Sequence, residues 1–146
     1  MKKNEELIGK IRGFNRFYTN IIGVVDRHVL DSPYSLTDAR VLYEISHTEN
    51  CSAKKIRENI DIDEGYLSRI VDRFISKGII RKSRSSADGR THVIVLTPKG
   101  KKEFAKLDRN SSKSIYGIVE KLSKKECEEL VDTMEKLRKL LAGHER

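Results

Sequence analysis

The sequence predicts a mainly helical α+β fold with one small β-hairpin. Most apolar residues recur at steps of three and four, the spacing of one helix face. Two short β-branched segments, residues 79–82 and 91–96, interrupt this spacing and predict two strands. The chain has 146 residues with nine Gly, two Pro and no Trp, which disfavours an all-β sandwich. We therefore expect one compact domain with helical extensions.

The first expected helix covers residues 7–30. Apolar side chains return on nearly every turn from Leu7 to Val29, so they share one face. A helix of this length is long for a small domain, and we expect it to pack against more than its own neighbours. The segment Asp31-Ser-Pro-Tyr is expected to end it.

Three shorter helices are expected next, each with a capping residue. Ser35 and Thr37 are alternative caps for the first of them. Ser52 would cap the second, Asp63 would cap the third, and Gly78 would end the third. The expected apolar face of this third helix comprises Leu67, Ile70, Val71, Phe74 and Ile75.

A hairpin and two long helices complete the expected fold. Residues 83–90 have the composition of a polar turn between the two strands. Thr97 would cap the next helix with Pro98 in its first turn, and Ser123 with Glu126 predicts a capping box for the last. A heptad seam follows in that last helix, made by Cys127, Leu130, Met134, Leu137 and Leu141.

The order of elements predicts a helix-turn-helix followed by a wing, at residues 33–98, between helical regions at 1–32 and 99–146. The net charge of +8 is concentrated in this middle part of the chain. Residues 54–102 carry 13 basic and six acidic residues, whereas the remainder carries 17 basic and 16 acidic residues. Such a local surplus points to a negatively charged partner, either nucleic acid or an anionic membrane.

The elements that carry this charge favour duplex DNA. The second helix of a helix-turn-helix enters the major groove, and an arginine on a wing fits the minor groove. Free N–H groups at the start of the preceding helix suit a phosphate. The candidate DNA contacts are Ser52, Lys54, Lys55, Gly65, Tyr66, Ser68, Arg69, Arg73, Arg84, Asp88 and Arg90. Within this set, Asp88 is expected to orient Arg90.

Other interpretations of the same residues remain open. Arg69 and Arg73 could solvate a surface helix and pair with Asp72 or Glu64, and the hairpin could be a solvated loop. Two separate elements that share the local charge make DNA binding the favoured interpretation.

A spaced sequence motif in this region is similar to that of a known protein family. Gly78-Ile-Ile is followed after seven residues by Asp88-Gly-Arg90, and after six more by Thr97-Pro-Lys-Gly100. With Leu67-Ser-Arg-Ile-Val-Asp-Arg73, this pattern resembles the MarR family of winged helix-turn-helix transcription regulators. Residues 30–45 are also similar to the regulator half of MarR–acetyltransferase fusions. No length remains for an acetyltransferase, and no catalytic motif is present, so we expect no enzyme activity.

The resemblance implies a homodimer held together by the first helix and the last two helices. Two recognition helices would then read successive major grooves of a pseudo-palindrome. The resemblance makes Arg69 a recognition-helix contact and Arg90 a minor-groove contact. Gly89 departs from the family, where a second basic residue is common, so the wing is expected to hold phosphate less tightly.

Many members of this family release DNA when a small anionic aromatic effector binds between the dimerisation helices and the winged domain. Residues of suitable chemistry are Tyr18, Arg40, Tyr43 and His47, although core aromatics with surface charges are the favoured explanation of these residues. We expect no cofactor and no metal, because the four His form no compact ligand motif. Cys127 is expected to pack as a small hydrophobe, and Cys51 near a helix N-terminus would favour a thiolate.

The sequence thus predicts a sequence-specific duplex-DNA-binding regulator, expected to be a homodimeric repressor that a ligand can release. With no signal peptide and no membrane span, it is expected in the cytoplasm. The alternatives are a winged-helix protein–protein interaction module and a non-specific architectural DNA binder.

Overall fold

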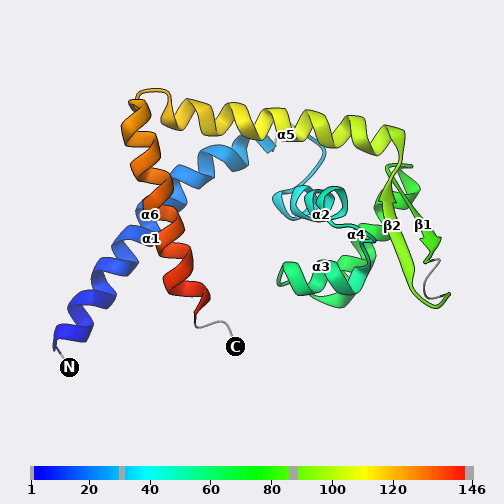
Figure 1. Cartoon of the computed structure of the whole chain (residues 1–146), viewed down its shortest axis with the longest axis horizontal. Coiled ribbons are helices and arrows are strands. Elements are labelled where there is room, and N and C mark those ends of the chain that lie inside the picture. The colour runs from blue at the N-terminus through cyan, green and yellow to red at the C-terminus, as the bar shows by residue number, and fades with distance from the viewer. Residues whose placement is uncertain (1, 30–31, 86–88, 144–146) are drawn as a thin grey trace.

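The structure is a computed structural model that describes residues 2–29, 32–85 and 89–143, with the side chains of α1 described for residues 3–23. Helices dominate, and one hairpin interrupts them (Figure 1). In chain order the elements are α1 (Lys2–Val29), α2 (Leu36–His47), α3 (Ala53–Asn59), α4 (Glu64–Ser76), β1 (Ile80–Arg84), β2 (His92–Leu96), α5 (Pro98–Val119) and α6 (Lys124–Ala142). The expected fold class is confirmed.

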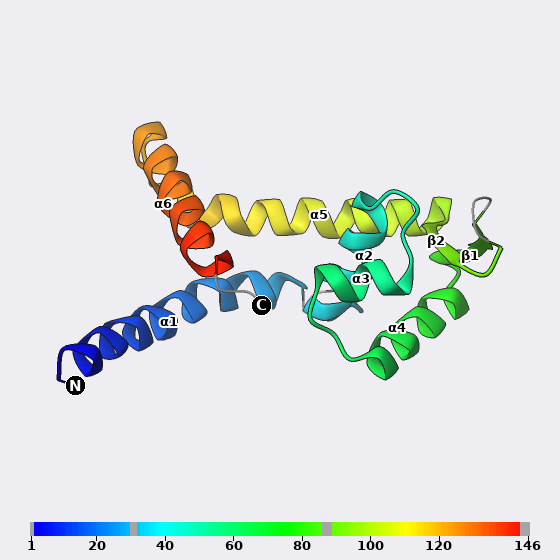
Figure 2. The same ribbon diagram turned by 60° about the horizontal axis from the view of Figure 1, so that its bottom comes forward.

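The chain forms a winged part at one end and a helical frame at the other. Helices α2, α3 and α4 and the hairpin lie below the first half of α5, while α1 and α6 extend from its second half (Figure 1). Helix α1 packs along α5, and the turned view shows the two helices side by side (Figure 2). Helix α5 therefore connects the two parts as one continuous rod.

The helix boundaries follow from local capping chemistry. Of the two alternative caps for α2, the structure selects Ser35, whose hydroxyl accepts a hydrogen bond from the backbone N–H of Asp38. Ser52, Asp63, Thr97 and Ser123 cap α3, α4, α5 and α6.

The end of α4 is a Schellman motif centred on Gly78. Its φ of 70° lies in the left-handed region, where an L side chain is strained. Gly78 N–H donates to the carbonyl of Ile75, and Ile79 N–H donates to that of Phe74. The predicted helix stop is confirmed, and it turns the chain into β1.

One hydrophobic core lies inside the winged part. Phe74, Leu42, Ile56, Leu67 and Ile94 are among its fully buried side chains. Ile75, which belongs to the expected apolar face of α4, is 39% exposed. It lies at the edge of the apolar face of α4, where no other element covers it fully.

The hairpin is antiparallel, with Ile80 opposite Leu96 and Arg84 opposite His92. Strand β2 also forms a hydrogen bond to the segment between α2 and α3. The N–H of Ile94 donates to the carbonyl of Cys51 (2.8 Å). Ile80 and Ile94 anchor the base of the hairpin in the core, so the Arg84–His92 end projects away from it.

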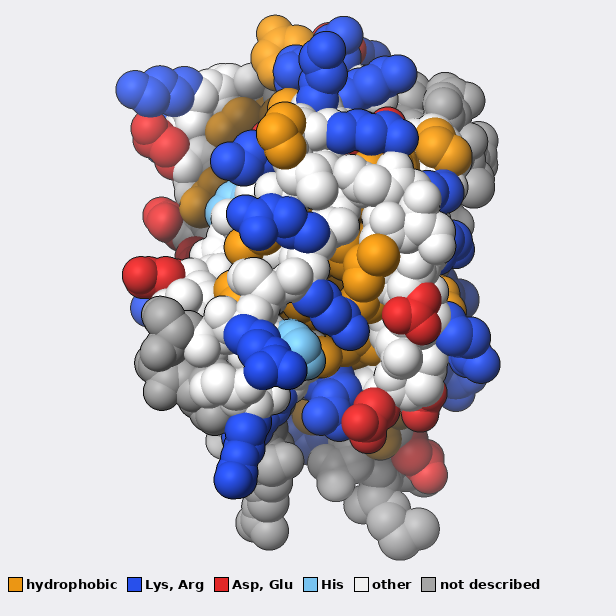
Figure 3. All heavy atoms as spheres, turned by 90° about the vertical axis from the view of Figure 1, so that its right-hand side faces the viewer, with side chains coloured by type: hydrophobic (Ala, Val, Ile, Leu, Met, Phe, Trp, Pro, Cys, Tyr) orange, Lys and Arg blue, Asp and Glu red, His pale blue; other side chains and the backbone are white. Residues whose placement is uncertain are grey.

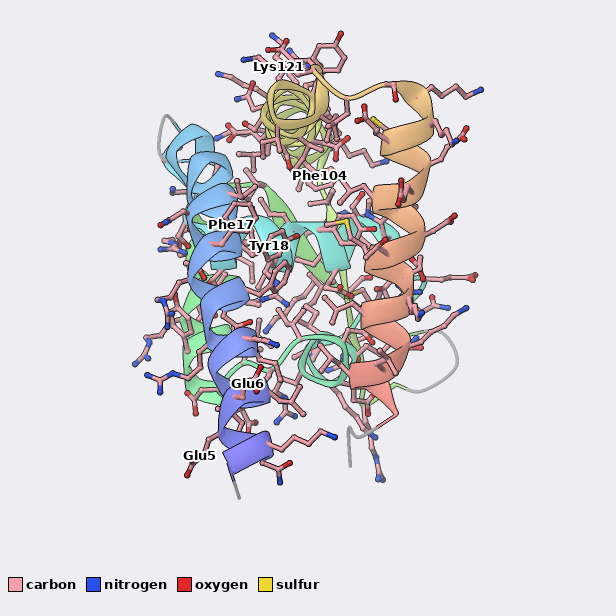
Figure 4. All side chains as sticks on the ribbon, turned by 90° about the vertical axis from the view of Figure 1, so that its left-hand side faces the viewer. Glu5, Glu6, Phe17, Tyr18, Phe104 and Lys121 are labelled. Atoms are coloured by element: carbon pink, nitrogen blue, oxygen red, sulfur yellow. The ribbon has the colours of Figure 1, made fainter. Side chains whose placement is uncertain are left out.

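The helical frame leaves large apolar surfaces uncovered. On α1 the exposed side chains include Leu7, Ile8, Ile11, Phe14 and Phe17, and none of the side chains of α6 is buried. Figure 4, a view from the left-hand side of Figure 1, shows side chains of α1 and α6 projecting into the space between these helices. Within the described ranges, no helix is long and apolar enough to cross a membrane.

Candidate nucleic-acid interface

The exposed face of α4 presents Tyr66, Ser68 and Arg69 to solvent. The guanidinium of Arg69 lies 5.9 Å from the ring centroid of Tyr66, so a cation–π contact orients it along the helix. Asp63 caps this end of α4 by accepting from the N–H of Tyr66 (2.9 Å). Gly65 is tied to the same cap, because a Cβ there would lie 3.2 Å from a carboxylate oxygen of Asp63.

Arg73, an expected DNA contact, forms an ion pair inside the fold. Its guanidinium pairs with the carboxylate of Asp38, whose side chain is only 4% exposed. The other carboxylate oxygen of Asp38 accepts from the backbone N–H of Ser35 (3.1 Å). Asp38 therefore joins the N-terminus of α2 to the recognition helix, and the expected alternatives, Asp72 and Glu64, do not take part.

Tyr34 makes a second link, from α4 to α5. Its ring packs edge-on against Phe74 at 6.1 Å, and its hydroxyl donates to the carboxylate of Glu103. Burial first, and then the contact with Glu103, raise the pKa of Tyr34 above the ordinary tyrosine range. The phenol therefore stays a hydrogen-bond donor at any physiological pH.

The start of α3 is less open than the sequence suggested. Ser52 is buried and its hydroxyl accepts from the N–H of Lys55 (3.2 Å). The ammonium of Lys55 donates to the carbonyl of Glu49, and that of Lys54 approaches Glu58 at 3.9 Å. Lys54 and Lys55 remain exposed beside α4, but the hydroxyl of Ser52 is already used inside the fold.

The wing carries Arg84 at the end of β1 and Arg90 just before β2, both exposed. The N–H of Ser85 donates to the carbonyl of Thr91 (2.8 Å), which extends the pairing one step toward the tip. Asp88, the expected orienting partner of Arg90, lies outside the described residues.

The end of the molecule that carries the hairpin and the start of α5 is strongly basic. Figure 3 shows Lys and Arg side chains spread over this face, with acidic side chains toward its edges. Basic side chains from β1 and from the first turns of α5 contribute to it, including Arg81, Lys82, Lys99 and Lys102. The charge surplus of residues 54–102 thus gathers on one end of the molecule.

The base of the wing is joined to the end of α4 by a compact set of contacts. Thr97 donates its N–H to the carbonyl of Ile79 (3.0 Å) and its hydroxyl to that of Gly78 (2.6 Å). The hydroxyl of Thr97 also accepts from the N–H of Gly100 (3.0 Å). Lys99 reaches the carbonyl of Lys77 (2.8 Å). The spaced glycine and threonine motif of the sequence is therefore one joint in the fold.

The four candidate effector residues are only partly brought together. Arg40 and Tyr43 line a cavity of about 190 Å³ between α2 and α5, together with Asp108. His47 stacks on Tyr43 at 3.9 Å, at the edge of this site. Tyr18 instead stacks on Phe14 of its own helix. Because the carboxylate of Asp108 lines the same cavity as Arg40, it lowers the expected affinity of the cavity for an anionic ligand.

The thiolate expectation for Cys51 is wrong. The side chain is 1% exposed, and burial raises the pKa of the thiol to about 11. Cys51 therefore stays protonated near neutral pH, which opposes a reactive role. No group of three or more His, Cys, Asp or Glu side chains is arranged to hold a metal ion in the part of the chain that the structure describes.

Two residues of the site were missed from the sequence. Asp38 shares the spacing of Val41, Leu42 and Ile45, so a charge on an otherwise apolar helix face was the available signal. Glu103 carried no comparable signal, because its partner Tyr34 lies 69 residues away in the chain.

An exposed second helix of the helix-turn-helix, a basic hairpin and a flanking helical frame define a winged helix-turn-helix fold, which is typical of DNA-binding proteins. The sequence profile of the MarR family matches residues 34–92. The chain is 29% identical over 104 residues to the HTH-type transcriptional regulator BilQ of Clostridium symbiosum, covering 71% of this chain and 72% of that protein. Over its winged part the chain is thus similar to the MarR family and to HTH-type transcriptional regulators.

Solved structures agree with the fold. A MarR family protein from Bacillus stearothermophilus superposes with a TM-score of 0.81 at 14% identity, over 94% of this chain and 97% of that one. Wild-type MarR from E. coli in its apo form gives a TM-score of 0.73 at 16% identity, over 86% and 94% of the two chains.

Proposed function

We propose that this regulator is a homodimeric repressor that reads a pseudo-palindromic operator with α4 and the wing. The observation that carries the proposal is the shared exposure of Arg69 and Tyr66 on α4, beside a hairpin that bears Arg84 and Arg90. One element suits the major groove and the other suits the minor groove of the same duplex. Repression follows if the bound dimer occupies a promoter.

The uncovered helical frame supports the homodimer. Exposed apolar side chains on α1 and α6 form a surface larger than scattered single residues would, and such a surface favours a protein partner. The heptad seam of α6 supplies Leu130, Met134, Leu137 and Leu141 to it. We propose regions 1–32 and 99–146 as the dimerisation region and 33–98 as the DNA-binding region. A two-fold dimer presents two copies of α4, which matches a palindromic site.

The decisive experiment is binding of the full chain to the promoter region of its own operon, with an Arg90→Ala variant. Removal of one groove arginine should cost about 1–3 kcal/mol of binding free energy. Lys136→Ala, a cation on α6 far from the winged part, serves as the matched control and should bind as the native chain does.

Each alternative predicts a different result. A protein–protein interaction module ignores duplex DNA even at low salt. An architectural binder holds any sequence equally well, whereas a specific operator should win by roughly 10³-fold or more in competition. Equal binding to every sequence, unaffected by Arg90→Ala, contradicts the proposal.

We also propose that a small-molecule effector regulates DNA binding. Its proposed site is the cavity lined by Arg40 and Tyr43. The cavity lies between α2 and α5, so a ligand that widened it would move the winged part relative to the frame. Titration with benzoate, followed by operator release, tests this step; an Arg40→Gln variant should respond less. Because the proposed target is chromosomal DNA, we place the protein in the cytoplasm.

A further inference from the structure

Helix α5 carries a row of cations along the side turned away from its own buried residues. Five basic side chains recur at steps of three and four, and all are exposed. At 3.6 residues per turn they share an arc of about 80°, centred about 120° from the buried Gly100, Leu107 and Ser114. We call this row the α5 basic stripe: Lys99, Lys102, Lys106, Arg109 and Lys113.

Glu103 lies one turn from Lys99 and from Lys106, but its carboxylate accepts from Tyr34 and is not paired with the stripe in the described residues. Cations on other helices pair one turn away, as Lys10 does with Glu6 and Lys124 does with Glu128. No stripe residue forms an ion pair within the described ranges, and Lys99 alone makes a side-chain hydrogen bond, to the carbonyl of Lys77.

The acidic residues of α5 point elsewhere. Glu103 accepts from Tyr34, and Asp108 lines the cavity shared with Arg40. Like charges one turn apart oppose helix formation, so the stripe weakens the helix that carries it. A row that is unbalanced and locally unfavourable is best explained by a polyanionic partner.

The position of the stripe separates it from the recognition helix. Helix α5 runs along the side of the molecule opposite α3 and α4 (Figures 1 and 2). Its stripe spans about 21 Å at 1.5 Å per residue. A duplex presents one phosphate per 1.7 Å of axis, or about 12 over this length, so phosphates outnumber the stripe cations along the same length.

We propose that the α5 basic stripe binds the phosphate backbone of a second segment of duplex DNA, without reading its sequence, while α4 and the wing hold the operator. The inference rests on the proposed DNA-binding function. The protein would thereby bridge two duplex segments, one on each side of the winged part.

The test is a bridging assay with the full chain. An immobilised duplex carrying the promoter site is saturated with protein, and a labelled duplex of random sequence is then added. The stripe variant combines Lys106→Gln, Arg109→Gln and Lys113→Gln. Lys99, which bonds to Lys77, and Lys102 are kept because both also belong to the basic end beside the hairpin. The control variant removes three charges near and on α6, by Lys121→Gln, Lys125→Gln and Lys136→Gln.

The native chain and the control should retain the labelled duplex at low salt, and the stripe variant should retain at least tenfold less. All three should bind the immobilised duplex within about twofold and show the same oligomeric state by light scattering. Three lost phosphate contacts should also reduce the salt slope of the second binding step by about 2.7.

Four outcomes overturn the inference, three of them in the bridging assay itself. The stripe variant retains the labelled duplex as well as the native chain does, the control loses it equally, or the native chain retains none. Polyglutamate captured in place of duplex identifies an acidic polypeptide partner instead and also overturns it. Failure to bind the immobilised duplex at all is a separate result, because it contradicts the proposed function.

Discussion

The backbone of Gly100 lies directly against the carbonyl group of Ile79. A Cβ at Gly100 would lie 1.8 Å from that carbonyl oxygen and 2.8 Å from its carbon. The contact brings the first turn of α5 onto the residue that follows the end of α4. It holds the recognition helix, the wing and the connecting rod α5 in one unit, so the orientation of α4 is set through α5.

Gly100→Ala should therefore lower the free energy of unfolding, by about 1–3 kcal/mol for an overpacked site. The opposing atoms belong to backbone and cannot rotate away. Gly117→Ala is the matched control in the same helix, where a Cβ meets nothing within 4 Å. It should stabilise the helix by up to about 1 kcal/mol. Urea denaturation of both variants checks the pair; equal midpoints contradict the contact.

Asp38→Asn should weaken the joint between α2 and α4. The amide oxygen can still accept from Ser35, but the charge that holds Arg73 is lost. Because a hydrogen bond to a charged group contributes about 1.5–3 kcal/mol, we expect a loss of stability near that size, discounted because Arg73 is half exposed. A double-mutant cycle with Arg73→Met measures the coupling, and additive effects would rule it out.

Leu137→Glu should dissociate the proposed dimer. The substitution places an unpaired charge on the heptad seam. Because the proposed dimer is two-fold symmetric, one interface contains this charge twice. We expect the dimer dissociation constant to rise at least tenfold, measured by light scattering over a dilution series. Lys136→Glu changes charge beside the seam and serves as control. A Leu137→Glu chain that dimerises like the native one places the interface elsewhere.

Cys51 should make stability fall at alkaline pH. The pKa of the thiol is raised to about 11 in the folded protein, so the unfolded chain ionises first as pH rises. This contribution is complete below about pH 9 and is lost progressively as pH rises toward 11. Cys51→Ala should show a shallower decline over that window in chemical denaturation. Parallel curves for the two proteins would contradict the buried, neutral thiol.

Local chemistry explains why the elements could be predicted. Ser52, Asp63, Thr97 and Ser123 cap the helices where their hydroxyl or carboxylate groups predicted, because a cap needs only the next few residues. Gly78 ends α4 for the same reason. The exposed Tyr66 and Arg69 were also accessible to prediction, since helical periodicity assigns the outward face.

Contacts between distant segments explain what could not be predicted. Arg73 was expected on the DNA-facing side, yet its guanidinium is held by Asp38, 35 residues earlier. Ser52 was expected to face a phosphate, yet its side chain is buried under its own helix. For Cys51, the nearby helix N-terminus is visible in the sequence, whereas the burial that raises the pKa of its thiol is not.

By itself, the sequence determined the order of helices and strands, their caps and the +7 surplus of residues 54–102, because periodicity, capping and charge are properties of near neighbours. The tertiary structure alone decided which polar groups are used inside the fold and which face solvent. The burial and pairing of polar groups depend on packing between segments far apart in the chain. One buried carboxylate, that of Asp38, thereby pairs with an arginine of the recognition helix.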